Sequence, residues 1–344
     1  MSVLEKKAKL AIGFITYGES TAKYLPYFLE SLKKQTQRNW ELFVVDNSES
    51  KENENIKLLK KFFPGLKINR PGENLGFARG YNLLINAARK QGAEYFLALN
   101  PDMVLEKDFV EKIISASGEE NVGAIAPKIL CWDFQNNKLT DMIDSTGISI
   151  TREQRFSDLN QGEKDDGRFN ESKFVFGFTG AAVLFRMEAL IDVAFKNQAG
   201  HDEYFDELMF MYKEDCDLSY RLRLAGWKIV FAPEARAYHH RSAVPKGESN
   251  LKIALNRRNK SRQLKKWSFL NSLVIFFKFK NLNYSLNVKA AVCWYQFKSL
   301  IFICLFEQYL LLEFGKIWQM RREIRQKRDA LKIRISLEKI EKLM

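Results

Sequence analysis

Apolar runs of strand length alternate with helix-period segments through the first half of the chain, and this alternation constrains the fold more than any other feature. Leu10–Thr16 has the length and composition of a buried strand, and apolar residues at helical spacing follow in 24–35. Further strands are expected at 42–45, 67–69, 95–99 and 122–126, and further helices at 56–63, 77–90 and 107–116. The alternation predicts an α/β, Rossmann-like, mostly parallel sheet with helices on both faces.

The second half of the chain is less regular. Residues 133–170 are polar and rich in Asp, Asn, Gln and Gly, which predicts an irregular excursion with a hairpin near Ile148–Ile150. Strands are expected again at 174–178, 181–185 and 228–232, and a helix at 215–225.

Charge divides the chain into two parts. Residues 251–344 hold 21 of the 55 Lys and Arg and 6 of the 42 Asp and Glu, so they carry +15 while residues 1–250 carry −2. We therefore expect a folded domain over 1–250 and a basic, aromatic helical tail over 251–344. Basic helices rich in Phe, Trp and Leu suit a membrane surface with anionic lipids. The alternative is a helical cap with solvated Lys and Arg.

The compartment follows from what the sequence lacks. Its four cysteines show neither CxxC pairing nor regular spacing, which favours a reducing compartment, and the first ten residues do not resemble a signal peptide. A membrane span at 290–312 is disfavoured by Lys298 and Glu307, but the sequence leaves open whether this stretch spans, lies on or avoids the membrane. We expect a cytoplasmic protein, peripheral to the inner face of the cell membrane.

Polar residues follow four of the expected strands. They are Thr16-Tyr17-Gly18, Asp46-Asn47-Ser48, the segment 74–82 and Asn100-Pro101-Asp102. Ligands of open α/β sheets bind at the carboxyl ends of strands, whereas the alternative for each group alone is an ordinary turn. Gly76 and Gly80 allow close backbone approach at a helix start, an arrangement suited to phosphate or ribose. Asp102 beside an Asn carbonyl is a partial ligand set for Mg²⁺ or Mn²⁺.

A second group of polar residues lies further along the chain. Glu214, Asp215 and Asp217 crowd a helix start, where the helix dipole alone could explain them. Because the preceding residues 205–212 are mostly apolar, we expect the acids to emerge from the core into a cleft, where a carboxylate can act as general base. His239 and His240 follow a strand and are candidates for a metal or phosphate contact.

Several motifs in a fixed order resemble those of the family 2 inverting glycosyltransferases with the GT-A fold, and more narrowly their rhamnosyltransferase-like branch. They are Asp46-Asn47-Ser48, Asn74-x-Gly76-Phe77-x-x-Gly80-x-Asn82, Asn100-Pro101-Asp102, Thr179-Gly180-Ala181, Glu214-Asp215-x-Asp217-Leu218 and Arg221-x-x-x-Ala225-Gly226-Trp227. The resemblance covers about three quarters of the chain, roughly residues 9–266.

The resemblance implies a role for each candidate residue. Thr16, Tyr17 and Asp46 would contact the nucleobase of the donor. The ribose and diphosphate would be held by Asn74, Gly76, Phe77 and Asn82. Asn100 stands where the family has the first acid of its metal motif, which leaves fewer protein charges on the metal, while Asp102 and His239 would hold Mg²⁺ or Mn²⁺. Asp215 would be the base, with Glu214 as its competitor. Gly180, Asp217, Trp227 and His240 would lie on the acceptor side or support it, His240 being the alternative to His239.

The implied reaction is a direct displacement that inverts the anomeric carbon. The donor would be a nucleotide-diphosphate sugar, such as dTDP-rhamnose or a UDP-sugar, and the acceptor a saccharide or lipid-linked saccharide in cell-surface polysaccharide synthesis. Two alternatives are a sugar nucleotidyltransferase and a non-enzymatic, basic nucleic-acid-binding protein. The first would usually carry a basic residue in the loop after strand one, which this chain lacks; the second would carry its charge on the folded domain, so we expect no nucleic-acid partner. The sugar, the base, the acceptor and the oligomeric state stay open.

Overall fold

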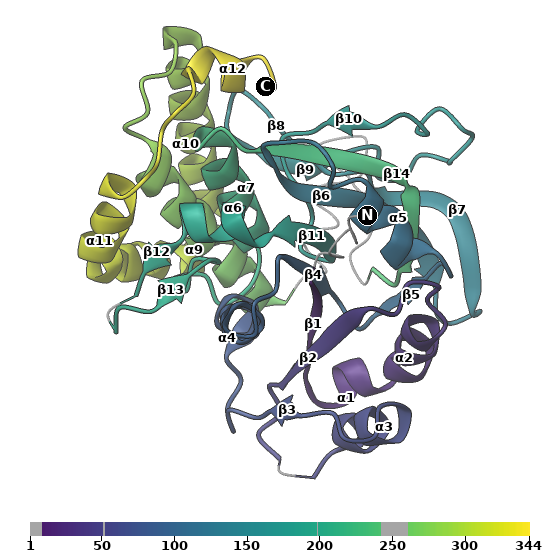
Figure 1. Ribbon diagram of the computed structural model, residues 1–344. Helices are drawn as coiled ribbons and strands as arrows, with labels where there is room; N and C mark the ends of the chain where they lie inside the picture. The colour runs from purple at the N-terminus through teal and green to yellow at the C-terminus, as the bar shows by residue number, and fades with distance from the viewer. Residues whose placement is uncertain (1–8, 51, 198, 242–260) are drawn as a thin grey trace.

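The computed structural model describes residues 9–50, 52–197, 199–241 and 261–344, and the expected domain boundary at 250 lies outside these ranges. A ten-stranded sheet forms the centre of the molecule, with the order β10-β14-β6-β11-β4-β1-β2-β3, while β5 pairs with β14 and β7 with β6 (Figure 1). Its strands are β1 Leu10–Thr16, β2 Trp40–Asp46, β3 Ile68–Asn69, β4 Tyr95–Leu99, β5 Met103–Leu105, β6 Val122–Asp133, β7 Lys138–Ser145, β10 Lys173–Phe174, β11 Ala182–Arg186 and β14 Lys228–His239.

Helices cover both faces of this sheet, as the alternation predicts. They are α1 Gly18–Ala22, α2 Leu25–Lys33, α3 Glu54–Phe62, α4 Gly76–Lys90, α5 Phe109–Ser115, α6 Met187–Val193 and α7 Glu214–Leu224. Successive residues of β1 enter opposite cores: Ala11 packs with α4, α6 and α7, while Ile12 and Phe14 pack with α2, α3 and α5. The predicted α/β architecture is confirmed. Four strand pairs are parallel (β1–β2, β1–β4, β2–β3 and β6–β14), and β11 lies antiparallel between β4 and β6.

The excursion expected at 133–170 is more regular than its composition predicts. It contains β7, which extends the sheet beside β6, and the hairpin of β8 Ile148–Ile150 with β9 Phe156–Asp158. Conversely, the strand expected at 174–178 shortens to β10, and α1 and α6 were not expected. The polar composition misled because β7 is exposed over its first half and forms by pairing with a distant strand, which local periodicity does not report. A further two-stranded pair, β12 Phe195–Lys196 with β13 Asp202–Glu203, lies next to α6.

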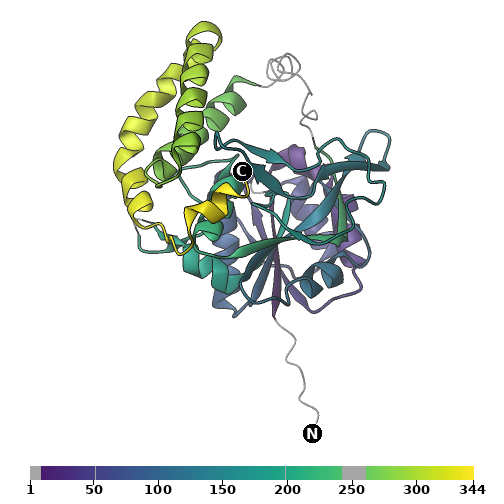
Figure 2. The same cartoon turned by 90° about the horizontal axis from the view of Figure 1, so that it is seen from above.

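The tail consists of α9 Arg262–Phe279, α10 Leu286–Phe306, the 3₁₀ helix η1 Gln308–Leu312, α11 Glu313–Asp329 and α12 Leu337–Glu341. These helices form a layer beside the sheet (Figure 2). Their apolar side chains build a third core that takes in Phe176 and Tyr220 of the sheet domain, and the rings of Tyr220 and Phe279 stack at 4.2 Å. Much of the tail is therefore a packed cap, the alternative that the sequence left open.

Candidate active site

The ends of β1 and β2 lie side by side and are tied together by Asp46. Thr16 stands opposite Asp46 in the parallel register, and its hydroxyl donates to Asp46 Oδ1 at 2.9 Å. Ser48 donates to the same oxygen at 2.7 Å, and Asn53 donates to Oδ2 at 2.7 Å. Asp46 and Thr16 are fully buried, whereas Tyr17 is exposed. In this structure the Asp46 carboxylate orders the strand ends and is not exposed for the expected contact with the nucleobase of the donor.

The Gly76 turn approaches protein backbone rather than open space. Gly76 has a φ of 71°, and a Cβ there would overlap the carbonyl oxygen of Phe210. Asn74 accepts from the Gly76 N–H at 2.9 Å, and the Phe77 N–H donates to the Phe210 carbonyl at 2.8 Å. The close approach expected of Gly76 is therefore made to the segment before α7. Of these residues, the partly exposed Asn74 and Phe77 keep surface for a donor.

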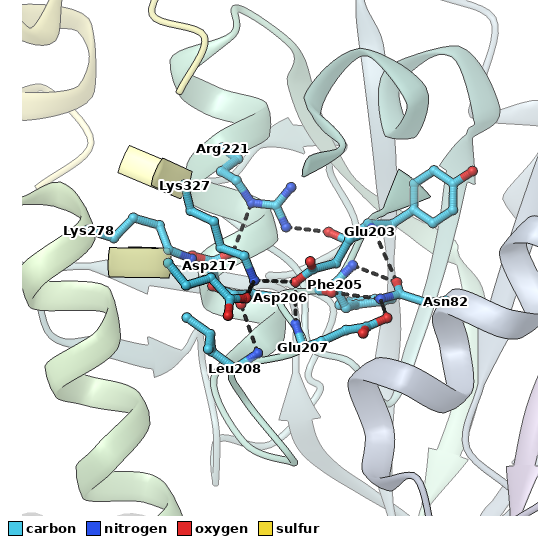
Figure 3. A network of polar contacts seen from close by, with 12 residues as sticks. Asn82, Glu203, Phe205, Asp206, Glu207, Leu208, Asp217, Arg221, Lys278 and Lys327 are labelled. Atoms are coloured by element: carbon cyan, nitrogen blue, oxygen red, sulfur yellow. Dashed lines mark hydrogen bonds and ion pairs between the residues drawn. The ribbon is translucent and has the colours of Figure 1, made fainter. Parts of the chain in front are cut away.

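Asn82 is a clamp within the protein, which corrects its expected place against the donor. Its Oδ1 accepts from the N–H groups of Tyr204 (3.1 Å) and Phe205 (2.9 Å). Its Nδ2 donates to the Phe205 carbonyl and to Glu207, both at 2.9 Å (Figure 3). The side chain is buried and all four of its hydrogen-bonding positions are used, so it has none left for a ligand.

Strand pairing brings His239 next to Asp102. β5 runs antiparallel to the end of β14, with Met103 opposite His239. His239 Nε2 lies 3.4 Å from Asp102 Oδ1, and His239 Nδ1 lies 2.8 Å from Asp144 Oδ2. Burial lowers the pKa of His239, but the Asp102 and Asp144 carboxylates outweigh it and raise that pKa to about 10. Asp144 is buried too, but His239 and Arg241 outweigh the effect of burial and lower the pKa of Asp144 to about 2.

Asp102 and His239 fit a divalent cation as a partial ligand set. Asp102 Oδ1 is buried and has no hydrogen-bond partner, which is what an oxygen reserved for a metal would show. Carboxylate oxygen and deprotonated imidazole nitrogen are both donors that Mn²⁺ accepts, so a bound ion would displace the proton from His239 Nε2. Among the described residues no group of three or more His, Cys, Asp or Glu could hold an ion.

His240 belongs to an aromatic cluster. Its ring lies 5.3 Å from the Tyr24 ring and 5.6 Å from the Phe134 ring, and its Nδ1 is 3.1 Å from the Trp132 carbonyl. Only its backbone reaches the candidate metal residues, since its N–H donates to the Asp102 carbonyl at 2.9 Å. His240 therefore supports the position of Asp102, and His239 is the histidine that faces it.

The acidic cluster begins α7 directly after a strained turn. Tyr212 and Lys213 have φ values of 75° and 69°, a region that costs a non-glycine residue roughly 1–2 kcal/mol. Asp215 Oδ2 then accepts from the Gly180 N–H at 2.9 Å, and its Oδ1 accepts from the Cys216 N–H at 2.8 Å. Burial raises the pKa of Asp215, although the two N–H groups oppose the rise.

The acidic cluster and the end of β4 meet at Gly180 and Ala181. The Asn100 N–H donates to the Ala181 carbonyl at 2.8 Å, one residue from the Gly180 that holds Asp215. Phe77 packs against the same glycine, since a Cβ on Gly180 would lie 3.0 Å from its ring. Residues from four distant parts of the sequence thus converge on one place.

Glu214 is more enclosed than its neighbour Asp215. It is 5 % exposed, and its buried Oε2 has no hydrogen-bond partner. Burial and the Asp215 carboxylate raise the pKa of Glu214 well above its usual value. Burial raises the pKa of the Tyr81 phenol, and the carboxylates of Asp102 and Glu214 raise it further. Both carboxylates therefore act on the same buried phenol.

The sequence did not single out Arg241, Asp144 and Asp158, which join the two halves of the site. Arg241 donates to Asp144 at 2.9 Å and to Asp158 at 2.8 Å. Asp158 in turn contributes to the raised pKa of Asp215. Arg241 follows the two histidines directly, which was an available signal, but both acids lie in the excursion whose pairing only the tertiary structure provides.

Two further candidates have structural places. Asp217 is fully buried and accepts from Arg221 at 2.8 Å. Trp227 follows the far end of the 11-residue helix α7, roughly 16 Å from its start, and donates to Asp192 at 2.8 Å. Of the two roles expected of Trp227, on the acceptor side or in support, this position favours support, because α7 carries the residue away from the acidic cluster.

The comparisons with known proteins agree with this geometry. The family model of glycosyl transferase family 2 matches residues 12–193. An N-acetylglucosaminyl-diphospho-decaprenol L-rhamnosyltransferase of Mycobacterium tuberculosis (strain CDC 1551 / Oshkosh) is 24 % identical over 256 residues, 68 % of this chain and 76 % of the relative. The O-antigen biosynthesis protein RfbC of Myxococcus xanthus is 24 % identical over 64 % of this chain, which spans 16 % of that protein.

A solved structure supports the fold. The structure of GalNAc-T7 with UDP, GalNAc and Mn²⁺ has a TM-score of 0.52 and 13 % identity, and the similarity covers 82 % of this chain and 54 % of that chain. The expected GT-A fold is thereby confirmed. Since the family model covers more than half of the sequence, the chain belongs to glycosyl transferase family 2 and is a glycosyltransferase.

Proposed function

We propose that this glycosyltransferase moves a sugar, from a nucleotide-diphosphate donor such as dTDP-rhamnose or a UDP-sugar, to a hydroxyl of a saccharide or lipid-linked saccharide, with inversion, in cell-surface polysaccharide synthesis. The observation that carries the proposal is the hydrogen bond from the Asn100 N–H to the Ala181 carbonyl, which brings the strand end before the Asp102–His239 pair next to the Gly180 that holds Asp215. The names of the two bacterial relatives support a product of the cell envelope. Family membership favours this function over the alternatives of a sugar nucleotidyltransferase and a nucleic-acid-binding protein.

Asp215 is the proposed base. Asp215 is partly exposed and its carboxylate accepts from two N–H groups, which favour its ionised form, whereas Glu214 is buried and one of its oxygens has no hydrogen-bond partner. In the proposed step, Asp215 takes the proton of the acceptor hydroxyl while that oxygen bonds to the anomeric carbon and the bond to the nucleoside diphosphate breaks. One displacement of this kind inverts the anomeric configuration.

Asp102 and His239 are the proposed protein ligands of Mg²⁺ or Mn²⁺. A bound cation would offset charge on the diphosphate leaving group. Asp144 would orient His239 through Nδ1, the usual task of a carboxylate behind a metal-binding histidine.

Replacing Asp215 with Asn tests the assignment. A positioned base contributes about 10²- to 10⁴-fold, so we expect transfer to fall by at least that much. Donor binding should survive, measured as the thermal shift given by UDP-, dTDP- and GDP-sugars with and without Mn²⁺. The same panel identifies the donor. Turnover of Asp215→Asn close to that of the wild type would exclude Asp215 as the base.

The tail offers a surface for the membrane in which a lipid-linked acceptor resides. Among the described residues, α10 is the one helix long and apolar enough to cross a bilayer, judged by length and composition. Its exposed apolar residues Trp294, Phe297, Ile301 and Leu305 recur at helical spacing on one face, and Phe306, Leu312 and Trp318, further along the chain, are exposed too. We call these seven residues the apolar band. Val288 and Val292 of α10 pack into the tail core, and Ile303 is also buried, which favours a helix that lies on the membrane.

Positive charge accompanies this band. Lys298 lies over the Trp294 ring at 5.6 Å, and Arg321 lies over the Trp318 ring at 4.2 Å. Aromatic side chains beside cations suit the headgroup region of an anionic bilayer. We therefore place the proposed enzyme at the cytoplasmic face of the cell membrane, bound through the apolar band.

Vesicle binding tests this placement. The full chain should sediment with vesicles containing phosphatidylglycerol more than with pure phosphatidylcholine, and less at high salt. Changing both Trp294 and Phe297 to Ser should weaken binding at least tenfold, since each buried aromatic contributes about 1 kcal/mol or more. Phe174→Ser is the matched control, because Phe174 is 48 % exposed and Phe297 54 %. Equal losses in both variants would contradict the assignment.

A further inference from the structure

The turn before α7 is held from the tail by Asn271. This α9 side chain is 1 % exposed, and its Nδ2 donates to the carbonyls of Met211 at 2.9 Å and Tyr212 at 2.7 Å. One turn earlier on the same helix, the Trp267 ring stacks on Phe210 at 4.9 Å. Both amide hydrogens of Asn271 are thus spent on the turn that contains the left-handed residues Tyr212 and Lys213.

Such a turn needs outside support. Two successive non-glycine residues with positive φ persist only where the surroundings hold them, and such sites cluster where function demands a fixed geometry. The turn ends at Glu214, so its conformation sets where α7 begins and where Asp215 stands relative to Gly180.

Lys278 holds α7 from the same helix. Its buried Nζ lies 2.6 Å from Asp217 Oδ1 and also pairs with Asp206. Asp217 is two residues beyond Asp215 and is further held by Arg221. On α11, Lys327 Nζ lies 2.7 Å from Asp206 and 2.5 Å from Glu203 (Figure 3). The buried network therefore contains three carboxylates and three cations, of which Lys278 and Lys327 belong to the tail.

The segment between Glu203 and Asp217 is thus gripped on two sides. Asn82 of α4 holds Tyr204 and Phe205, and α9 and α11 hold Asp206, the turn and Asp217. We propose that Asn271 and Lys278 are positioning residues for the base, which makes the C-terminal helices part of the catalytic unit. This inference rests on the proposed role of Asp215. A displacement of about 1 Å at a reacting group can cost about 100-fold in rate, so the loss of either tail contact should lower kcat measurably.

Asn271→Ala in the full chain tests the proposal, with Asn281→Ala as the matched control because Asn281 is exposed in the turn after α9. We expect kcat to fall about 10- to 100-fold in Asn271→Ala, while the KM for the donor changes less than about threefold. Hydrogen exchange of the amides at 211–217 should become faster, with exchange in β1 and β4 unchanged. The control should match the wild type in all three measurements.

A second variant separates positioning from folding. Lys278→Met leaves two carboxylates short of a cation, whereas Lys278→Met combined with Asp206→Asn restores a neutral network. The double variant should regain thermal stability, yet kcat should stay at least tenfold low because Asp217 has lost its tail contact. Lys278→Arg should recover part of kcat. Wild-type kcat in the stable double variant would overturn the role of Lys278.

Two results would overturn the role of Asn271. One is a kcat within twofold of the wild type, and the other is a kcat that falls only in proportion to the folded fraction. If the wild type transfers no sugar from any donor, the proposed function fails, and the exchange measurement still decides whether Asn271 holds the turn. Unchanged exchange at 211–217 in Asn271→Ala would then refute the claim that Asn271 holds the turn before α7.

Discussion

Replacing Glu203 with Gln tests how the buried network carries its charge. Glu203 is 1 % exposed, and its Oε1 accepts from Lys327 and from the Glu207 N–H, both at 2.5 Å. Its Oε2 is buried without a partner. Burial and the neighbouring Asp206 raise the pKa of Glu203 from 4.5 to about 7, with Lys327 opposing them.

The raised pKa of Glu203 changes the free energy of unfolding with a defined sign and size. Because the folded protein holds this proton more tightly than the unfolded chain, Glu203 makes the free energy of unfolding decrease as the pH rises from 4.5 to 7. A change from 4.5 to about 7 corresponds to about 3 kcal/mol. Gln keeps the acceptor toward Lys327 and Glu207 but cannot titrate, so the Gln variant should lack this decrease.

Urea unfolding of wild type and Glu203→Gln between pH 5 and pH 8 measures the difference. The wild type should lose about 2.5 kcal/mol relative to the variant over this range, and most of the loss should fall between pH 5 and pH 7, that is, below the folded-state pKa of about 7. Asp206→Asn is the contrasting control. Lys278 and Lys327 outweigh burial and lower the pKa of Asp206, so breaking its pairs should destabilise the protein by about 3–5 kcal/mol at pH 7. A pH-independent difference between wild type and Glu203→Gln would refute the reasoning.

Two further predictions concern the site itself. Gly76→Ala should destabilise the protein by more than about 2 kcal/mol in urea unfolding, because the left-handed φ costs roughly 1–2 kcal/mol and the new Cβ overlaps Phe210. Gly72 has a φ of 80° with open space around it, so Gly72→Ala should cost only the roughly 1–2 kcal/mol of the left-handed conformation. Equal losses in the two variants would contradict the overlap at Gly76. Asp144→Asn should weaken Mn²⁺ binding about 10- to 100-fold, measured by titrating the metal against thermal stability. Unchanged binding would remove Asp144 from the proposed support of His239.

The strand ends and their polar residues could be predicted because they depend on local pattern. Periodicity over about ten residues identified β1, β2 and β4 with the helices between them, and parallel strands must bring their carboxyl ends to one edge. The order of short motifs was enough to indicate the family, whose match is now shown over residues 12–193. None of this required knowledge of a contact between distant residues.

The tertiary structure decided what the individual side chains do. Asn82 belongs to the family-like motif, yet its partners lie more than 120 residues away, so no local pattern could show that its hydrogen bonds are used. The sequence assigned the basic residues of the tail to a membrane surface or to solvent, but two of them, Lys278 and Lys327, are buried against Asp206 and Asp217 of the sheet domain. A charge can be buried only against an opposite charge, and which distant charges meet is fixed by packing rather than by sequence spacing. The sequence therefore determined the sheet and the edge where chemistry is expected, and the packing of the tail determined how the base is held there.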